Sequence, residues 1–174
     1  FKDRFFYQLY FQTPGVAETE LEADVRTALR KFYHMASGQM DIGLMPDKPA
    51  DADLLSDLPD PEQLGHWMSN ADLDFYVNEF SRSGFRGPLN YYRNHNLTWE
   101  LTEGAPTQIQ QPALFVAGDR DGVIAMAAQA LEAMPNYVTD LRVNALIPGI
   151  GHWTQQEAAE ATNEYLLDWL AGLN

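Results

Sequence analysis

Cysteine is absent from this chain of 174 residues, which excludes disulfides, thiolate metal sites and a cysteine nucleophile. The sequence also has no apolar run near the roughly 20 residues that a membrane-spanning helix needs, so we expect a soluble protein without a membrane partner. The sequence begins with Phe1, which is neither a start methionine nor the basic opening of a signal peptide. We therefore expect that the N-terminus is processed or truncated. A bacterial-type cytoplasm is the compartment that fits these absences.

Positive charge is scarce. The chain has 11 lysines and arginines against 25 aspartates and glutamates, which gives a formal net charge of -14 at pH 7. Such a charge repels nucleic-acid phosphates and anionic membranes at long range, so we expect no nucleic-acid partner. The histidines also lack the H-x-x-x-H spacing of a metal site, so we expect neither a metal nor a cofactor. They stand at positions His34, His66, His95 and His152.

The sequence up to Glu103 predicts helices and loops only. Apolar residues at helical spacing predict one amphipathic helix from Val16 to Lys31. Four prolines interrupt the pattern between Gly38 and Gly65, which predicts a long irregular loop. A second helix is expected after the capping signal "SNAD", with Gly84 as its stop. Its apolar stripe consists of Leu73, Tyr76, Val77 and Phe80.

Beyond Pro106 the pattern changes to alternating strands and helices. The runs "PALFVAG" (112–118) and "LRVNALIPG" (141–149) predict two strands. Between them we expect a helix that Pro135 ends, and after them a helix from Glu157 to Leu170. The last helix is expected to turn six side chains toward a core: Ala158, Ala161, Tyr165, Leu166, Trp169 and Leu170. This order predicts a parallel sheet. Two strands make too small a sheet, so its other strands are expected outside this chain.

Candidate catalytic residues follow the two predicted strands. "AGDRDGV" (117–123) and "GIGHW" (149–153) place Asp121 and His152 at the carboxyl ends of neighbouring strands, where open α/β sheets bind ligands. A lone histidine there is more often structural than catalytic. A carboxylate on the adjacent strand end favours the catalytic interpretation, because it fixes the imidazole tautomer and stabilises the imidazolium. Asp119 is a second acid in the same turn and remains an alternative.

Four motifs resemble a known family. "FFYQLYFQTPGVAETELEADVR", "SGFRGPLNYYRN", "GDRDGV" and "GHWTQ" together are similar to the soluble-type epoxide hydrolases, which have the α/β-hydrolase fold. They occur in the family's order and cover nearly the whole chain. The resemblance implies an α/β protein in which residues 1–105 form a helical cap (lid) domain. Residues 106–174 would then be the last strands and helices of a mostly parallel sheet, so that the chain is the C-terminal portion of the fold.

The resemblance also implies roles for individual residues. Asp121 matches the acid of the family's triad, His152 matches its base, and Tyr7 and Tyr92 match the lid tyrosines that polarise the epoxide oxygen. An epoxide opens to an alkoxide that needs a hydrogen-bond donor in a dry pocket, and a phenol with a pKa of about 10 supplies one at neutral pH. Three further residues are expected to contact the substrate: Gln8, Trp153 and Val123.

Two positions depart from the family pattern. Tyr91 stands where the family usually has tryptophan, and Gly122 where related enzymes can carry a larger side chain. Both departures are expected to alter the shape of the pocket without removing a proton donor.

The expected reaction is the opening of an epoxide to a vicinal diol through a covalent alkyl ester, which water activated by His152 and Asp121 hydrolyses. The expected partners are a small apolar epoxide and a further N-terminal segment that carries the nucleophile. Asp3 lies in no strand-to-helix elbow and is not assigned that role. A homodimer is left open. Two alternatives also stay open, a haloalkane dehalogenase or esterase on the same fold, and a non-catalytic relative that binds a ligand.

Overall fold

The computed structural model describes residues 3–40 and 47–173. Their contacts divide them into two compact units. The first unit consists of residues 3–35, 47–64 and 68–104, and the second of residues 36–40, 65–67 and 105–173. The roles of cap and core that the sequence suggested for these parts remain predictions. No helix among the described residues is both long enough and apolar enough to cross a membrane.

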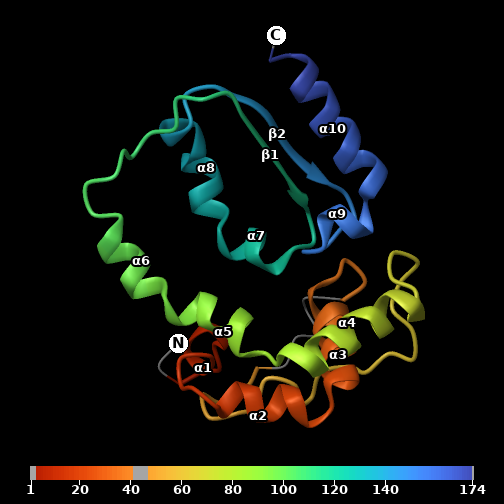
Figure 1. Ribbon diagram of the computed structural model, residues 1–174. Helices are drawn as coiled ribbons and strands as arrows, with labels where there is room; N and C mark the ends of the chain where they lie inside the picture. Colours follow the sequence, from red (N-terminus) through yellow and green to blue (C-terminus); the bar gives the residue numbers. More distant parts are fainter. Residues whose placement is uncertain (1–2, 41–46, 174) are drawn as a thin grey trace. The chain divides into compact units, whose positions relative to one another are not determined.

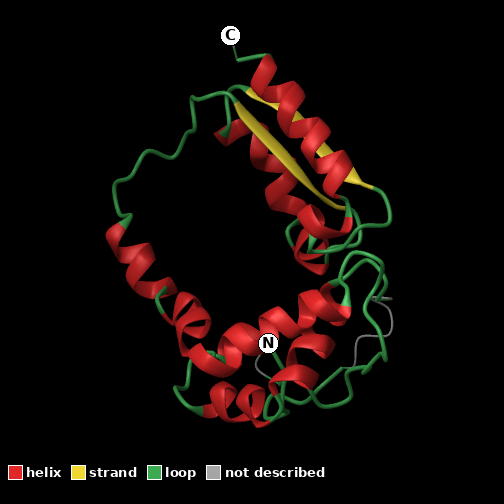
Figure 2. Ribbon diagram, turned by 45° about the vertical axis from the view of Figure 1, so that its right-hand side comes forward, coloured by secondary structure: helices red, strands yellow, loops and turns green. Residues whose placement is uncertain are grey.

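The first unit is built from helices and loops (Figures 1 and 2). Its helices are α1 (Tyr7–Tyr10), α2 (Val16–Ala23), α3 (Val25–Ala36), α4 (Asn70–Ser83), α5 (Arg86–Arg93) and α6 (His95–Leu101). Their shared core contains the buried side chains of Phe11, Ala17, Leu21, Ala28, Leu29, Leu73, Phe85 and Leu89. The apolar stripes of the sequence therefore identify the buried faces of α2, α3 and α4.

The prediction of one continuous helix from Val16 to Lys31 is wrong. The chain leaves helical geometry at Asp24, where φ is -148° and ψ is 89°. Oδ1 of Asp24 accepts a hydrogen bond from the Thr27 amide at 3.1 Å, as a residue that caps a helix start does. Aspartate favours such a cap over a helix interior, so α3 begins afresh although the apolar spacing runs through the break.

Helix α4 begins and ends where the sequence predicts. The Ser69 hydroxyl accepts from the Asp72 amide at 3.2 Å, and the Asp72 carboxylate accepts from the Ser69 amide at 2.9 Å. At the other end Gly84 has a φ of +69°, a conformation that a residue without Cβ adopts at little cost. Between Gly38 and Gly65 the described residues contain neither helix nor strand, as predicted, and residues 41–46 lie outside the described part.

The second unit contains the predicted pair of parallel strands. Strand β1 (Ala113–Gly118) pairs with β2 (Leu141–Ile147), with Val116 opposite Ala145. The unit's helices are α7 (Gly122–Met126), α8 (Ala128–Tyr137), α9 (Thr154–Glu157) and α10 (Ala159–Ala171). Helix α10 packs against both strands, and Figure 2 shows the strand pair in yellow within this unit. The predicted order of strand, helix, strand and helix is confirmed.

Two details of the helix predictions for this unit are wrong. Pro135 lies inside α8 and does not end it, since the helix continues to Tyr137. The amide of Val138 still donates to the Met134 carbonyl at 2.9 Å and closes the last turn. The last helix is also interrupted, at Ala158, where φ is -136° and ψ is 52°.

Three of the side chains that the last helix was expected to turn toward a core are exposed among the described residues. Tyr165, Leu166 and Leu170 are 38%, 40% and 45% exposed, and α10 has no buried residue. A sheet of two strands covers only part of this face, and the other strands of the sheet are expected outside this chain.

Candidate active site

Asp121 and His152 meet at the carboxyl ends of the two strands. Asp121 follows β1 and precedes α7, where its Oδ1 accepts from the Val123 amide at 2.8 Å. Its Oδ2 lies 2.9 Å from Nδ1 of His152, which follows β2. This contact favours the tautomer with the proton on Nδ1, so that Nε2 carries the lone pair. The Asp121 side chain is 10% exposed and that of His152 is 45% exposed, which suits a held acid and an accessible base.

Asp119, the alternative acid, has a different partner. Its Oδ1 accepts from the amide of Gly149 at 2.7 Å and so joins the loop after β1 to the turn after β2. Its own amide donates to the Ile147 carbonyl at 3.1 Å. Asp121 is therefore the acid that the structure brings to His152, and Asp119 fixes the turn that precedes the histidine.

The loop that carries His152 runs in direct contact with neighbouring backbone. A Cβ added at Gly151 would stand 2.3 Å from the Gly38 amide nitrogen and 2.6 Å from the Ala36 carbonyl oxygen. A Cβ added at Gly118 would stand 2.1 Å from the carbonyl oxygen of Ile150. These neighbours are backbone atoms that cannot turn aside, so a side chain at either position requires the backbone itself to shift.

We expect Gly151→Ala to lower the free energy of unfolding by roughly 2 kcal/mol, because the backbone of residues 36–38 must shift to admit the methyl group. Chemical denaturation measures the change. Gly122→Ala is the matched control, since a Cβ at Gly122 meets nothing within 4 Å. Equal stability of the two variants would contradict the close packing of this loop.

Tyr7 and Tyr92 lie together in the first unit. Their rings meet edge to face, with centroids 5.8 Å apart, and Phe11 lies against both, at 5.7 Å from Tyr7 and 5.0 Å from Tyr92. Burial, and next the neighbouring Tyr7, raises the pKa of Tyr92. The Tyr92 phenol thus keeps its proton at neutral pH, as a hydrogen-bond donor must. Tyr91 is 76% exposed, so its departure from the family pattern falls on an exposed side chain.

The three residues expected to contact substrate lie beside these two groups. Nε2 of Gln8 donates to the Tyr7 hydroxyl at 3.1 Å. The Trp153 ring lies edge to face with the His152 ring at 5.2 Å. Val123, whose amide holds Asp121, is 41% exposed. Each thus adjoins a predicted catalytic residue, and the contact with substrate itself remains a prediction.

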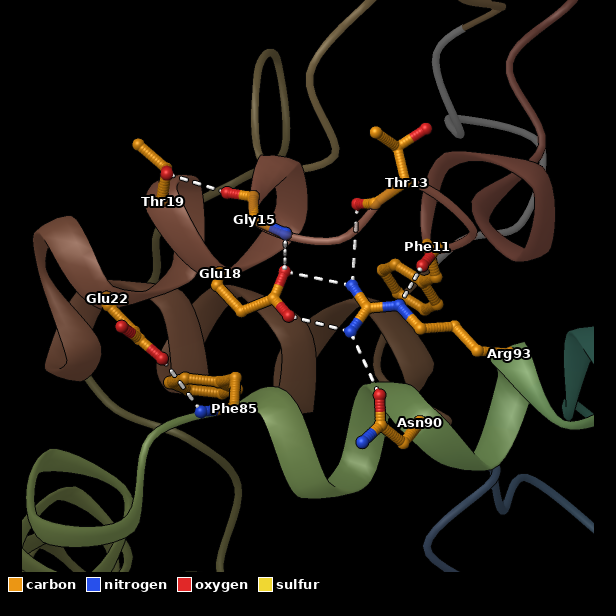
Figure 3. Close-up of polar contacts among 9 residues, drawn as sticks. All are labelled: Phe11, Thr13, Gly15, Glu18, Thr19, Glu22, Phe85, Asn90 and Arg93. Atoms are coloured by element: carbon orange, nitrogen blue, oxygen red, sulfur yellow. Dashed lines mark hydrogen bonds and ion pairs between the residues drawn. The ribbon is translucent and has the colours of Figure 1, made fainter.

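Arg93, which directly follows Tyr92, makes contacts that the sequence did not reveal (Figure 3). Its Nη1 and Nη2 donate to the two carboxylate oxygens of Glu18 at 2.7 and 2.9 Å. Its Nε donates to the Phe11 carbonyl at 2.8 Å, and Nη1 also reaches Oδ1 of Asn90 at 3.1 Å. The guanidinium therefore joins α5 to the end of α1 and to α2. The only signal in the sequence was the arginine inside the quoted motif "NYYRN".

This ion pair makes the first unit sensitive to acid. The hydrogen bonds from Arg93 lower the pKa of the Glu18 carboxyl from 4.5 to about 2. A carboxyl with a lowered pKa stabilises the fold above pH 4.5, and that stabilisation is lost as the pH falls toward 2. Both side chains are little exposed, 11% for Arg93 and 13% for Glu18.

We expect Glu18→Gln to cost roughly 2 kcal/mol of unfolding free energy at pH 7, because it leaves the Arg93 charge largely buried without its partner. The variant should also lose stability less steeply than the parent between pH 4.5 and 2. Denaturant titrations at several pH values measure both effects. Glu100→Gln, at an exposed position of α6, is the control. Parallel pH profiles for Glu18→Gln and the parent would contradict the assignment.

Among the described residues, no group of three or more His, Asp or Glu side chains is arranged to hold a metal ion. The candidate residues form two groups, each within one unit: Asp121 and His152 at the strand ends of the second unit, and Tyr7 and Tyr92 in the first.

Comparisons with known proteins identify the class. No protein-family model matches the chain. The chain is 36% identical to epoxide hydrolase A of Mycobacterium tuberculosis over 178 aligned residues. The alignment covers 99% of this chain and 54% of the relative. Against the crystal structure of epoxide hydrolase A from Mycobacterium thermoresistibile the TM-score is 0.88, with 40% identity over 99% of this chain and 54% of that one. An epoxide hydrolase from an endophytic Streptomyces gives a TM-score of 0.92, with 40% identity over 98% and 53%.

The parallel strand pair with its flanking helices is thus part of an α/β-hydrolase fold. Within that fold the chain belongs to the epoxide hydrolase family. It spans about half the length of the mycobacterial relatives that it matches.

Proposed function

We propose that the protein carrying this chain hydrolyses epoxides to vicinal diols. The observation that carries the proposal is the 2.9 Å contact between Asp121 and His152 at the strand ends, in a chain related to epoxide hydrolases along its whole length. The edge-to-face pair of Tyr7 and Tyr92 adds two hydroxyl donors from the helical unit. The substrate class that fits is a small apolar epoxide.

The first chemical step forms an ester. A carboxylate on a segment outside these residues attacks one epoxide carbon, and the bond from that carbon to the ring oxygen breaks. The oxygen keeps the electron pair, is stabilised by the Tyr7 and Tyr92 hydroxyls, and takes a proton from one of them. Because the oxygen becomes more basic as the ring opens, the two donors bind the transition state more strongly than the substrate.

The second step hydrolyses the ester. Nε2 of His152 takes a proton from a water molecule, and the hydroxide adds to the ester carbonyl. The carbonyl carbon then releases the diol oxygen, which takes its proton back from the imidazolium. The carboxylic acid that remains gives up a proton, the tyrosinate regains one, and the starting state is restored. Asp121 stabilises the imidazolium throughout this step.

A direct assay tests the reaction class. We expect the full-length protein to convert a simple aryl epoxide to its diol faster than it converts a haloalkane or an ester of similar size. Faster release of halide would identify a dehalogenase, and faster ester cleavage an esterase. Absence of all three activities would favour a relative that only binds its ligand.

The intact mass of the denatured protein tests the need for a further segment. We expect a mass well above the 19.6 kDa of this chain, with the nucleophile on the same polypeptide. A single species at 19.6 kDa would move the search to a separate partner chain.

A further inference from the structure

A buried carboxylate lies behind the histidine loop. Glu157 is 8% exposed and forms the last residue of α9. Its Oε2 accepts from the Gly38 amide at 2.8 Å and from the Gly151 amide at 3.3 Å, and its Oε1 accepts from the Trp153 amide at 3.2 Å. Gly151 and Trp153 are the residues on either side of His152. One side chain therefore holds the backbone both before and after the histidine.

Neighbouring bonds complete the support of the loop. The amide of His152 itself donates to the Ala36 carbonyl at 2.8 Å. Thr154, also buried, donates through its hydroxyl to the Gly151 carbonyl at 3.2 Å. From the loop after β1, Nη1 of Arg120 donates to the Gly38 carbonyl at 3.0 Å. The backbone of residues 151–153 is thus tied to two other segments of the same unit.

The chemistry of Glu157 indicates that a carboxylate is required here. A buried carboxylate is costly unless donors satisfy it, and amide donors to an ionised acceptor make short, strong hydrogen bonds. The three donors that the structure describes for Glu157 are backbone amides. An amide side chain of the same shape would turn an NH₂ group toward at least one of these N–H donors.

We infer that Glu157 is a positioning residue for His152. By fixing the backbone on both sides of the imidazole, it keeps Nδ1 within 2.9 Å of Asp121 and keeps Nε2 directed toward the water that attacks the ester. The inference rests on the proposed function for its kinetic consequence. His152 acts only in ester hydrolysis, so loss of Glu157 slows the second step and leaves ester formation nearly unchanged.

The experiment compares Glu157→Gln with Glu160→Gln in the full-length protein. Glu160 is an exposed glutamate in the first turn of α10 and serves as the matched control. We expect ester hydrolysis in Glu157→Gln to be about 10- to 100-fold slower, since a displacement near 1 Å costs that much. Single-turnover ester formation should change less than about threefold, and KM should fall with kcat because the ester accumulates. Intact mass spectrometry after mixing with epoxide detects the ester.

Equal slowing of both steps would overturn the inference, because a role in folding alone lowers the amount of active protein without changing the ratio of the two rates. No slowing of either step would overturn it as well. Glu157→Asp keeps the charge with a shorter reach. It should fold if Glu157→Gln does not, and it should show the same change in that ratio to a smaller extent.

A spectroscopic signal separates this inference from the proposed function. The Nδ1 proton of His152, bonded to Asp121, should give a sharp downfield proton resonance in the parent and in Glu160→Gln, and should broaden by exchange with water in Glu157→Gln. If the parent turns over no epoxide, the proposed function fails while this signal still tests the positioning. An unchanged resonance in Glu157→Gln would overturn the inference whatever the activity.

Discussion

His152→Gln will stop turnover at the covalent ester. Glutamine can still bond to Asp121 but cannot take a proton from water, so the second step loses its base while the first keeps its donors. We expect kcat to fall by about 10³-fold, within the range for a general base. Mixing the variant with excess aryl epoxide should convert the protein to a species heavier by the mass of the epoxide, as intact mass spectrometry would show.

The control for this result is His66→Gln, at an exposed position of the same unit. It should turn over epoxide like the parent and should accumulate no ester. If His152→Gln retains more than about a tenth of the parent kcat, or loses activity without accumulating an ester, His152 is not the base of the second step.

Replacing both tyrosines by phenylalanine will produce the opposite kinetic pattern. The variant with Tyr7→Phe and Tyr92→Phe keeps the rings that pack on Phe11 but offers no hydroxyl to the opening epoxide. Loss of one donor to a developing oxyanion costs about 10²- to 10³-fold, so each single change should slow ester formation by about 10²-fold and the double change by more. No ester should accumulate, because the first step becomes rate-limiting.

Tyr91→Phe is the control, because this neighbouring side chain is 76% exposed and lies on the same helix as Tyr92. We expect its rates to match the parent within about twofold. Circular dichroism of the double variant tests whether the helices remain intact. Retained activity in a folded double variant would remove the tyrosines from the mechanism.

Local patterns in the sequence were enough to place the acid and the histidine. Two apolar runs set the strands, and parallel strands bring the residues that follow them to one edge of the sheet. The choice of Asp121 over Asp119 followed from the family's motif, and in the structure Asp121 is the aspartate that lies against His152, while its catalytic role stays a prediction. The meeting of Tyr7 with Tyr92 could not be derived from spacing, since it depends on how helices far apart in the chain pack.

The residues that support the site were not visible in the sequence. Glu157 and the Gly38 amide that it binds are separated by 119 positions, and Arg93 lies 75 positions from Glu18. An isolated glutamate is most often an exposed residue, so burial was the missing information. The break at Asp24 was not predicted for a different reason. Apolar periodicity indicates which face of a helix is buried, but it does not indicate where one helix ends and an aspartate caps the start of the next.

The close approach of Gly38 and Gly151 also has a consequence for protein engineering. Loop regions are the usual places to insert a tag, a linker or a grafted peptide. The segment after α3 looks suitable because its described residues contain no regular secondary structure. An insertion beside Gly38 would nevertheless pull its amide away from Glu157 and release the backbone that carries the histidine. The exposed turn at Ala50 and Asp51 is the better insertion point, because foreign residues there can extend into solvent while the histidine loop keeps its support.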